Sequence, residues 1–190
     1  ILAAFACAYS QGISFEIIAA ALKKFKPVPG RFEAVTAGQP FTVIIDYAHT
    51  PDALGNLIYA AKTIKHKRII TVFGCGGDRD RSKRPLMGEI SGRLSDYTIV
   101  TSDNPRTEVP ERIALDVEVG LQKAKRKNYE VIVDRTAAIE RAVSICASDD
   151  ILLIAGKGHE NYQIIGDKRI RYNDKEVAIK ILSEKYGKKQ

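Results

Sequence analysis

The sequence predicts an α/β protein in which a mostly parallel sheet is covered by helices on both faces. Short apolar segments rich in β-branched residues, such as 68–73 and 150–155, are typical of buried strands. Segments of about 10–15 residues with helical patterning separate them, as in chains that connect parallel strands through helices. Glycine-rich or charged loops directly follow several of the apolar segments, and ligands bind at that edge of a parallel sheet.

The first elements are two short helices, expected at residues 2–9 and 14–24, with Ser14 as the N-cap of the second. The sequence K-P-V-P-G at 26–30 disfavours both helix and strand. We therefore expect a domain boundary at Pro27. Residues 1–27 are interpreted as the helical end of one domain, and residues 28–190 as a second domain.

After this boundary, strands and helices alternate. The predicted strands are residues 32–36, 42–45, 68–73, 97–101, 130–133 and 150–155. The predicted helices are residues 51–64, 85–94, 110–125 and 136–146. Thr50 is the expected cap of the first of these helices, with Pro51 at its first position. A hairpin of 162–165 and 169–172, turning at Gly166-Asp167, and a helix at 174–186 complete the prediction.

Composition limits the class of protein. The 190 residues suffice for one domain, or for one domain with a piece of another, and no apolar run approaches the length of a membrane span. The start is apolar but has no Met and no positive flank, so we interpret it as part of something longer. Cys7, Cys75 and Cys146 give no disulfide framework and no metal spacing, which favours reduced thiols in a cytoplasmic protein. The net charge of +7 favours anionic partners.

Two of the loops at the predicted sheet edge follow the strands 42–45 and 68–73. In D-Y-A-H-T-P-D at 46–52, Asp46 ends a strand and His49 lies just before a helix N-terminus, which favours an anion. A capping or packing role is the alternative for His49. The loop G-C-G-G-D-R-D-R at 74–81 combines glycines, which permit close backbone approach, with alternating charges. It matches neither a P-loop nor a dinucleotide fingerprint, and a solvated charge cluster is the alternative.

The third loop is D-N-P-R at 103–106. Asp103 and Asn104 supply short polar groups, Pro105 fixes the backbone, and Arg106 offers a planar fork suited to a carboxylate or phosphate. The alternative is a turn with a surface arginine.

The fourth loop, A-G-K-G-H-E at 155–160, places Lys157 between glycines but lacks the Ser or Thr of a phosphate loop. No catalytic triad and no metal-ligand spacing emerges along the chain. We therefore assign no catalytic residue and no metal ligand within it.

Together and in this order, these loops resemble the motifs of the Mur ligases, and most closely the MurE type. The matching segments are 28–33, 46–54, 72–80 with 83–88, 101–106, and 155–160 with 162–163. The resemblance covers almost the whole chain. It implies a Rossmann-like C-terminal domain of the family, preceded by the end of its central ATP-binding domain.

The resemblance also implies an activity for the parent protein, ATP-dependent amide formation in peptidoglycan biosynthesis. ATP phosphorylates the carboxylate of UDP-MurNAc-L-Ala-D-Glu, and the amine of a diamino acid attacks the acyl phosphate. The family's phosphate loop, Mg²⁺ ligands and carbamylated lysine match nothing in this chain. The isolated fragment is therefore expected to be inactive. The resemblance implies that the parent protein uses ATP and Mg²⁺ and is a cytoplasmic monomer. The UDP-linked acceptor is expected to bind the domains that this chain lacks.

Residue by residue, the resemblance implies two binding sites. It places Arg31 near the ATP phosphates, Asp46 near the ribose and His49 at the nucleotide. The positions that match the site for meso-2,6-diaminopimelate are Arg79, Asp103, Asn104, Pro105, Arg106, Gly156 and Glu160.

Arg106 is expected to decide between diaminopimelate and lysine. Its guanidinium gains a charge-assisted bond of about 1.5–3 kcal/mol from the second carboxylate of diaminopimelate, and such sites reject analogues by ~10⁴-fold. Lysine-adding relatives usually lack an arginine here. The alternatives are a lysine-adding or other Mur-type ligase, and a non-catalytic binding domain. A nucleic-acid-binding module is disfavoured because the aromatic residues lie mostly inside strand patterns.

Overall fold

The computed structural model describes residues 2–25, 28–125 and 128–187, so the predicted boundary at Pro27 lies outside the described residues. The helices are α1 (Leu2–Ser10), α2 (Phe15–Lys24), α3 (Pro51–Lys62), α4 (Lys83–Leu94), α5 (Pro110–Lys123), α6 (Arg135–Ile145) and α7 (Asp174–Tyr186). The strands are β1 (Glu33–Val35), β2 (Thr42–Asp46), β3 (Ile69–Phe73), β4 (Tyr97–Val100), β5 (Tyr129–Val131), β6 (Ile151–Ala155), β7 (Tyr162–Ile165) and β8 (Lys168–Arg171).

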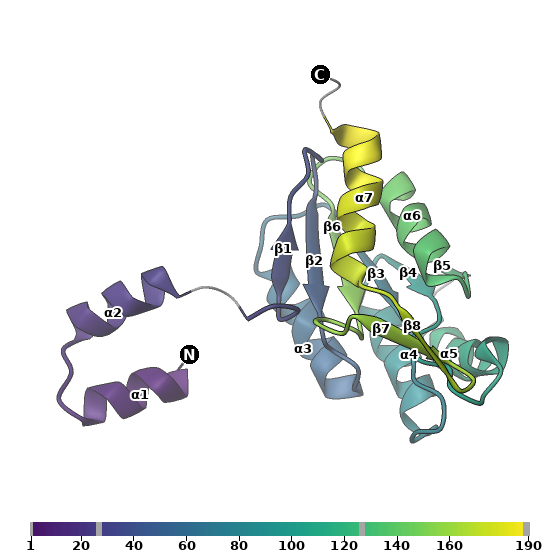
Figure 1. The fold of residues 1–190 in the computed structure, drawn as a ribbon, viewed down its shortest axis with the longest axis horizontal. Coiled ribbons are helices and arrows are strands. Elements are labelled where there is room, and N and C mark those ends of the chain that lie inside the picture. The colour runs from purple at the N-terminus through teal and green to yellow at the C-terminus, as the bar shows by residue number, and fades with distance from the viewer. Residues whose placement is uncertain (1, 26–27, 126–127, 188–190) are drawn as a thin grey trace.

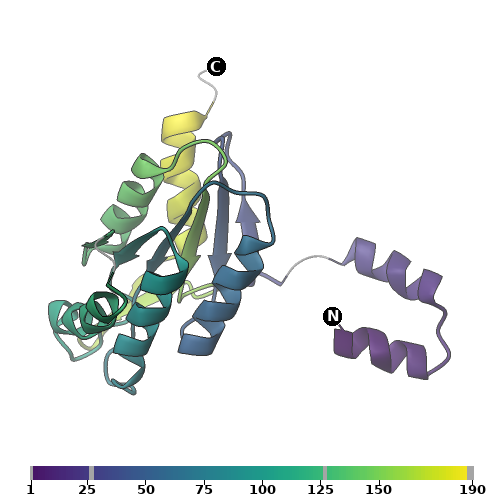
Figure 2. The same cartoon turned by 180° about the vertical axis from the view of Figure 1, so that it is seen from behind.

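The predicted fold class is confirmed. A six-stranded sheet has the order β1-β2-β6-β3-β4-β5, in which only the edge strand β1 is antiparallel to its neighbour. The strands β7 and β8 form the predicted hairpin. In Figure 1, α6 and α7 lie in front of the sheet, and Figure 2 shows α3 and α4 covering the opposite face.

Alternate residues of the strands enter two separate cores. In β6, Ile151 and Leu153 pack with apolar residues of α3, α4 and α5. Leu152 and Ile154 point the other way and pack with residues of α6 and α7. Because strand side chains alternate between faces, burial on both faces requires the continuous apolar sequence seen here.

Glycines let α4 and α5 cross closely. A Cβ on Gly88 would overlap the carbonyl oxygen of Val117, and one on Gly120 would overlap that of Pro85. This contact anchors α4, which follows the glycine-rich loop after β3, against α5, which follows the loop after β4.

The predicted element bounds agree with the structure to within two residues. The start of α4 was predicted at Pro85, but the helix begins at Lys83. Proline is tolerated at this third position because the first-turn N–H groups of a helix have no intrahelical partner. Thr50 and Ser14 cap α3 and α2 as predicted, each accepting a hydrogen bond from a first-turn backbone N–H.

The helices α1 and α2 pack on each other and lie apart from the sheet (Figure 1). Several of their large apolar side chains are exposed, among them Phe15, Ile17 and Phe25. None of the described helices has both the length and the apolar character needed to cross a bilayer.

Candidate functional site

The four loops singled out in the sequence meet at one edge of the sheet and enclose a pocket of about 380 Å³. The lining residues are Tyr47, His49, Thr50, Gly76, Arg79, Lys83, Asp103, Asn104, Arg106, Gly156, Glu160 and Tyr162. This convergence follows from the parallel strands, whose carboxyl ends all face the same edge.

Arg106 points its guanidinium toward the glycine-rich loop. Its Nη1 donates to the carbonyl oxygen of Gly77 over 2.8 Å, and the side chain is only partly exposed. The backbone of Arg106 is held with φ 52 because its N–H donates to Ile164 and its carbonyl accepts from Gly166, both at the β7–β8 hairpin. The D-N-P-R loop is therefore clamped between the glycine-rich loop and the hairpin.

An ion pair joins the first turn of α4 to the segment that follows Arg106. Arg84, whose side chain is 1% exposed, donates to both carboxylate oxygens of Glu108, at 3.0 and 2.8 Å. These hydrogen bonds lower the pKa of Glu108 to about 2. Glu108 also accepts from the N–H of Asp78, and a Cβ on Gly77 would overlap the carbonyl oxygen of Pro105. Arg79 is exposed at the rim of the pocket and donates to the carbonyl of Asp78.

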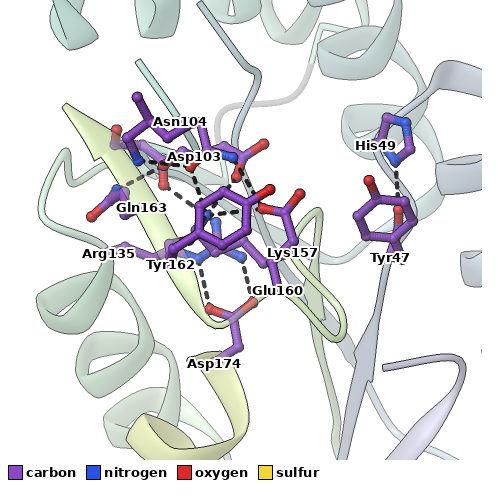
Figure 3. Close-up of polar contacts among 12 residues, drawn as sticks. Tyr47, His49, Asp103, Asn104, Arg135, Lys157, Glu160, Tyr162, Gln163 and Asp174 are labelled. Atoms are coloured by element: carbon purple, nitrogen blue, oxygen red, sulfur yellow. Dashed lines mark hydrogen bonds and ion pairs between the residues drawn. The ribbon is translucent and has the colours of Figure 1, made fainter. Parts of the chain in front are cut away.

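Lys157 belongs to the loop after β6, and its side chain is fully buried against the D-N-P-R loop (Figure 3). Its Nζ donates to Asn104 Oδ1 over 3.0 Å and to the carbonyl of Tyr162 over 2.8 Å. The carboxylates of Asp103 and Glu160 lie 3.2 and 3.4 Å from the same nitrogen. The Nδ2 group of Asn104 donates to Glu160 over 3.0 Å.

A second buried ion pair lies behind these groups, as Figure 3 shows. Arg135 makes two hydrogen bonds of 2.7 Å to the carboxylate of Asp174, and both side chains are 0% exposed. The same guanidinium donates to the carbonyls of Ser102 and Ala155, which precede the D-N-P-R and G-K-G-H-E sequences. Arg135 therefore ties both loops to the first turn of α7.

Gly156 supplies an open corner between the two loops. It has φ +116, a conformation that favours glycine, and the position of a Cβ on it would lie 4.0 Å from both Arg135 and Asp103.

The residues expected at the nucleotide gather around Tyr47. The guanidinium of Arg31 lies 4.7 Å from the centre of the Tyr47 ring, and Nδ1 of His49 lies 2.8 Å from the Tyr47 carbonyl oxygen. The carboxylate of Asp46 accepts hydrogen bonds from the backbone N–H groups of Phe32 and Ala48, which fixes the strand ends at this point. Of the three residues expected at the nucleotide, only His49 lines the pocket.

An exposed arginine over an aromatic ring fits a polyanionic, aromatic ligand such as ATP. For a metal the fit is different. Within residues 2–25, 28–125 and 128–187, no group of three or more His, Cys, Asp or Glu side chains could hold a cation.

Sequence reasoning missed several residues of the site. Tyr47 and Lys83 lie inside the segments 46–54 and 83–88, where no local pattern marks either as a site residue. Both line the pocket, and Lys83 Nζ donates to the His49 carbonyl over 2.9 Å. The sequence around Lys157 indicates only an incomplete phosphate loop. The pair Arg135–Asp174 left no local signal because its members are far apart in the sequence.

Comparisons with known proteins identify the family of this chain. A family model described as "Mur ligase, glutamate ligase domain" matches residues 30–158. A relative from Syntrophomonas wolfei, named UDP-N-acetylmuramoyl-L-alanyl-D-glutamate–2,6-diaminopimelate ligase, is 50% identical over 184 residues, which cover 97% of this chain and 38% of the relative. A relative of the same name from Alkaliphilus oremlandii is 53% identical over 173 residues, covering 91% and 35%.

Solved structures agree with these matches. The structure of a ligase with the same name superimposes with a TM-score of 0.78 at 36% identity, covering 97% of this chain and 37% of that one. MurC from Thermotoga maritima shares the fold, with a TM-score of 0.65 at 23% identity and coverage of 97% and 36%. The chain spans a little over a third of the length of these relatives. Because the family model matches residues 30–158, which are more than half of the chain, the chain belongs to the Mur ligase family.

Proposed function

We propose that this chain is the amino-acid-recognising part of an ATP-dependent ligase that adds meso-2,6-diaminopimelate to UDP-MurNAc-L-Ala-D-Glu. The names of the relatives that are about half identical to it support this activity for the longer protein. ATP supplies the energy by forming an acyl phosphate on the acceptor. The chain's own residues bind and orient the incoming amino acid.

The charges that line the pocket complement diaminopimelate, which carries two carboxylates and two ammonium groups. Arg79, Lys83 and Arg106 supply cationic groups at the pocket, and Asp103 and Glu160 supply anionic ones. Arg106 and Arg79 bind the carboxylates, whereas Glu160 binds an ammonium group. Asn104, Pro105 and Gly156 shape the wall between them and leave room for the backbone of the ligand.

The observation that carries the proposal is the inward-facing guanidinium of Arg106. It is held 2.8 Å from the Gly77 carbonyl within a pocket that also contains Glu160, so one wall attracts a carboxylate and another attracts an amine. Lysine lacks the distal carboxylate and would leave this partly buried arginine without an anionic partner. Such a mismatch costs far more than the loss of one exposed contact.

The nucleotide is proposed to bind beside this pocket. Arg31 contacts the phosphates, Asp46 lies near the ribose and His49 contacts the nucleotide. The exposure of Arg31 over Tyr47 supports this arrangement. Mg²⁺ and the phosphate loop are assigned to the part of the protein that this chain does not span, and the chain alone is expected to form no amide bond.

Residues 1–27 are proposed to be the end of the preceding ATP-binding domain, and residues 28–190 the C-terminal domain. The exposed apolar side chains of α1 and α2, such as Phe15 and Ile17, support this division because they have the character of an interior surface. The longer protein is proposed to work as a monomer in the cytoplasm, where ATP is available.

Titration calorimetry of the 190-residue chain tests the proposal. Meso-2,6-diaminopimelate should bind, and L-lysine should bind at least a hundredfold more weakly. The variant Arg106→Ala should lose most of the affinity for diaminopimelate and most of this discrimination. Equal affinities for the two amino acids, or an unchanged preference in Arg106→Ala, would contradict the assignment of the substrate to this pocket.

A further inference from the structure

Lys157 lies among the groups assigned to the amino acid, yet its side chain is fully buried. An ammonium group away from water is costly unless oxygen atoms surround it. Four oxygens do so here, from Asn104, Tyr162, Asp103 and Glu160. Lys157 is therefore fully engaged with the chain itself.

The contacts of Lys157 determine which way the amide of Asn104 faces. Asn104 Oδ1 accepts from Lys157 Nζ and also from the backbone N–H of Ile164, each over 3.0 Å. A rotated amide would place its NH₂ group against both donors. Only one orientation of the amide accepts from Lys157 Nζ and the Ile164 N–H and also donates to the Glu160 carboxylate. That orientation directs Nδ2 of Asn104 to Glu160.

The same arrangement leaves one side of the Glu160 carboxylate for a ligand. Oε2 accepts from Asn104 Nδ2 and lies 3.4 Å from Lys157 Nζ. The hydrogen bonds found among the described residues use this oxygen and not Oε1. Glu160 lines the pocket, so Oε1 is the atom that an incoming ammonium group can reach.

We propose that Lys157 is a positioning residue for amino-acid binding, which orients Asn104 and Glu160 without touching the ligand. This inference rests on the proposed function, since it concerns the site for the amino acid. Without the ammonium, the carboxylates of Asp103 and Glu160 would lack their shared counter-ion, and the amide of Asn104 could rotate. The two loops would then separate, and Glu160 would no longer present a fixed oxygen.

The test compares the wild-type chain with Lys157→Met, which keeps an unbranched side chain only one atom shorter and removes its charge. Lys67→Met is the matched control, because Lys67 forms an exposed ion pair with Asp149 at the opposite end of the sheet. Two quantities are measured well below the melting temperature of each variant. They are the affinity for meso-2,6-diaminopimelate, by calorimetry, and the exchange of the Asn104 side-chain amide hydrogens with water, by NMR.

Lys157→Met should weaken diaminopimelate binding at least tenfold and speed the exchange of the Asn104 amide hydrogens, whereas Lys67→Met should change neither. A purely structural role would lower the melting temperature and leave both quantities unchanged in the folded protein. Unchanged affinity, or an Asn104 amide that stays protected in Lys157→Met, overturns the proposal.

The two proposals fail in different ways. If the wild-type chain binds neither diaminopimelate nor lysine, the proposed function of this pocket fails, and amide exchange in the variant still decides whether Lys157 orients Asn104. If Lys157→Met does not fold, hydrogen exchange of the Lys157 ammonium group in the wild-type chain tests the proposal instead. Exchange as fast as that of Lys67 overturns the proposal, and slow exchange with magnetisation transfer to Asn104 supports it.

Discussion

Removal of one partner from the buried pair Arg135–Asp174 is expected to destabilise the protein strongly. In Asp174→Asn the volume is kept, but the two charge-assisted hydrogen bonds of 2.7 Å from Arg135 are replaced by at most one to a neutral amide oxygen, and the amide NH₂ group faces the guanidinium. Both side chains are 0% exposed, so water cannot replace the missing carboxylate. Breaking a buried pair in this way costs about 3–5 kcal/mol, a large part of the ~5–15 kcal/mol that stabilises a typical domain.

Urea unfolding followed by circular dichroism measures this loss. The midpoint should fall while the slope against urea stays the same, and the melting temperature should drop by roughly 6–20 °C. Arg171→Gln is the control, since Arg171 pairs with Glu176 on the surface, where the side chains are 80% and 61% exposed. Its effect should stay below about 1 kcal/mol.

A double variant separates the charge effect from lost packing. Arg135→Met with Asp174→Leu removes both charges, so it should recover part of the stability lost in Asp174→Asn. Recovery should be incomplete because the carbonyls of Ser102 and Ala155 also lose their donor. A cost below 1 kcal/mol for Asp174→Asn alone would refute the view that this pair is sealed from water.

Three further predictions concern glycines, pH and backbone strain. Gly55→Ala in α3 should stabilise the protein by about 0.5–1 kcal/mol, because the new Cβ meets only Ile90 at 3.8 Å. Gly120→Ala in α5 should cost about 1–3 kcal/mol, because its Cβ would overlap the carbonyl oxygen of Pro85. Urea unfolding that gives both variants a change of the same sign would contradict this. The pKa of Glu108 is lowered from 4.5 to about 2 by its bonds to Arg84, so its contribution is complete above about pH 4.5 and is lost as the pH falls toward 2. Unfolding free energies between pH 5 and 2 should therefore fall less steeply in Glu108→Gln than in the wild type. Parallel curves of unfolding free energy against pH would contradict a lowered pKa of Glu108 in the folded protein. Arg106→Gly should be more stable than Arg106→Ala by about 1 kcal/mol, since alanine keeps the strain of φ 52; equal midpoints in urea would show that this strain is absent.

Local patterns were sufficient to predict the sheet edge and its loops. Thr50 before Pro51 marked the start of α3, and Gly166 marked the turn of the hairpin, because caps and turns depend on neighbouring residues. The inward direction of Arg106 was not determined in this way. It depends on Gly77 and Ile164, which approach only when the sheet and hairpin are both formed.

The ion pairs illustrate the same limit. A lysine between two glycines is compatible with an exposed loop, a phosphate-binding loop or a buried ammonium. The choice is made by Asn104 and Asp103, more than fifty positions away. Likewise, Arg135 is the first residue of α6, and the helical pattern there does not indicate which residue it pairs with. Its partner is Asp174, at the start of α7.

The alternating buried charges match the zwitterionic amino acid that is proposed for this corner of the sheet. In spatial order, the charged groups are Asp174, Arg135, Asp103, Lys157 and Glu160, so their signs alternate. The five groups together carry one net negative charge, located at the end that lines the pocket. In the proposed complex, the ammonium group of the amino acid completes the alternation and neutralises this charge. Because each buried charge is stabilised by its neighbours, the loops that carry them are held in place before the ligand arrives, and the entropy lost on binding is correspondingly smaller.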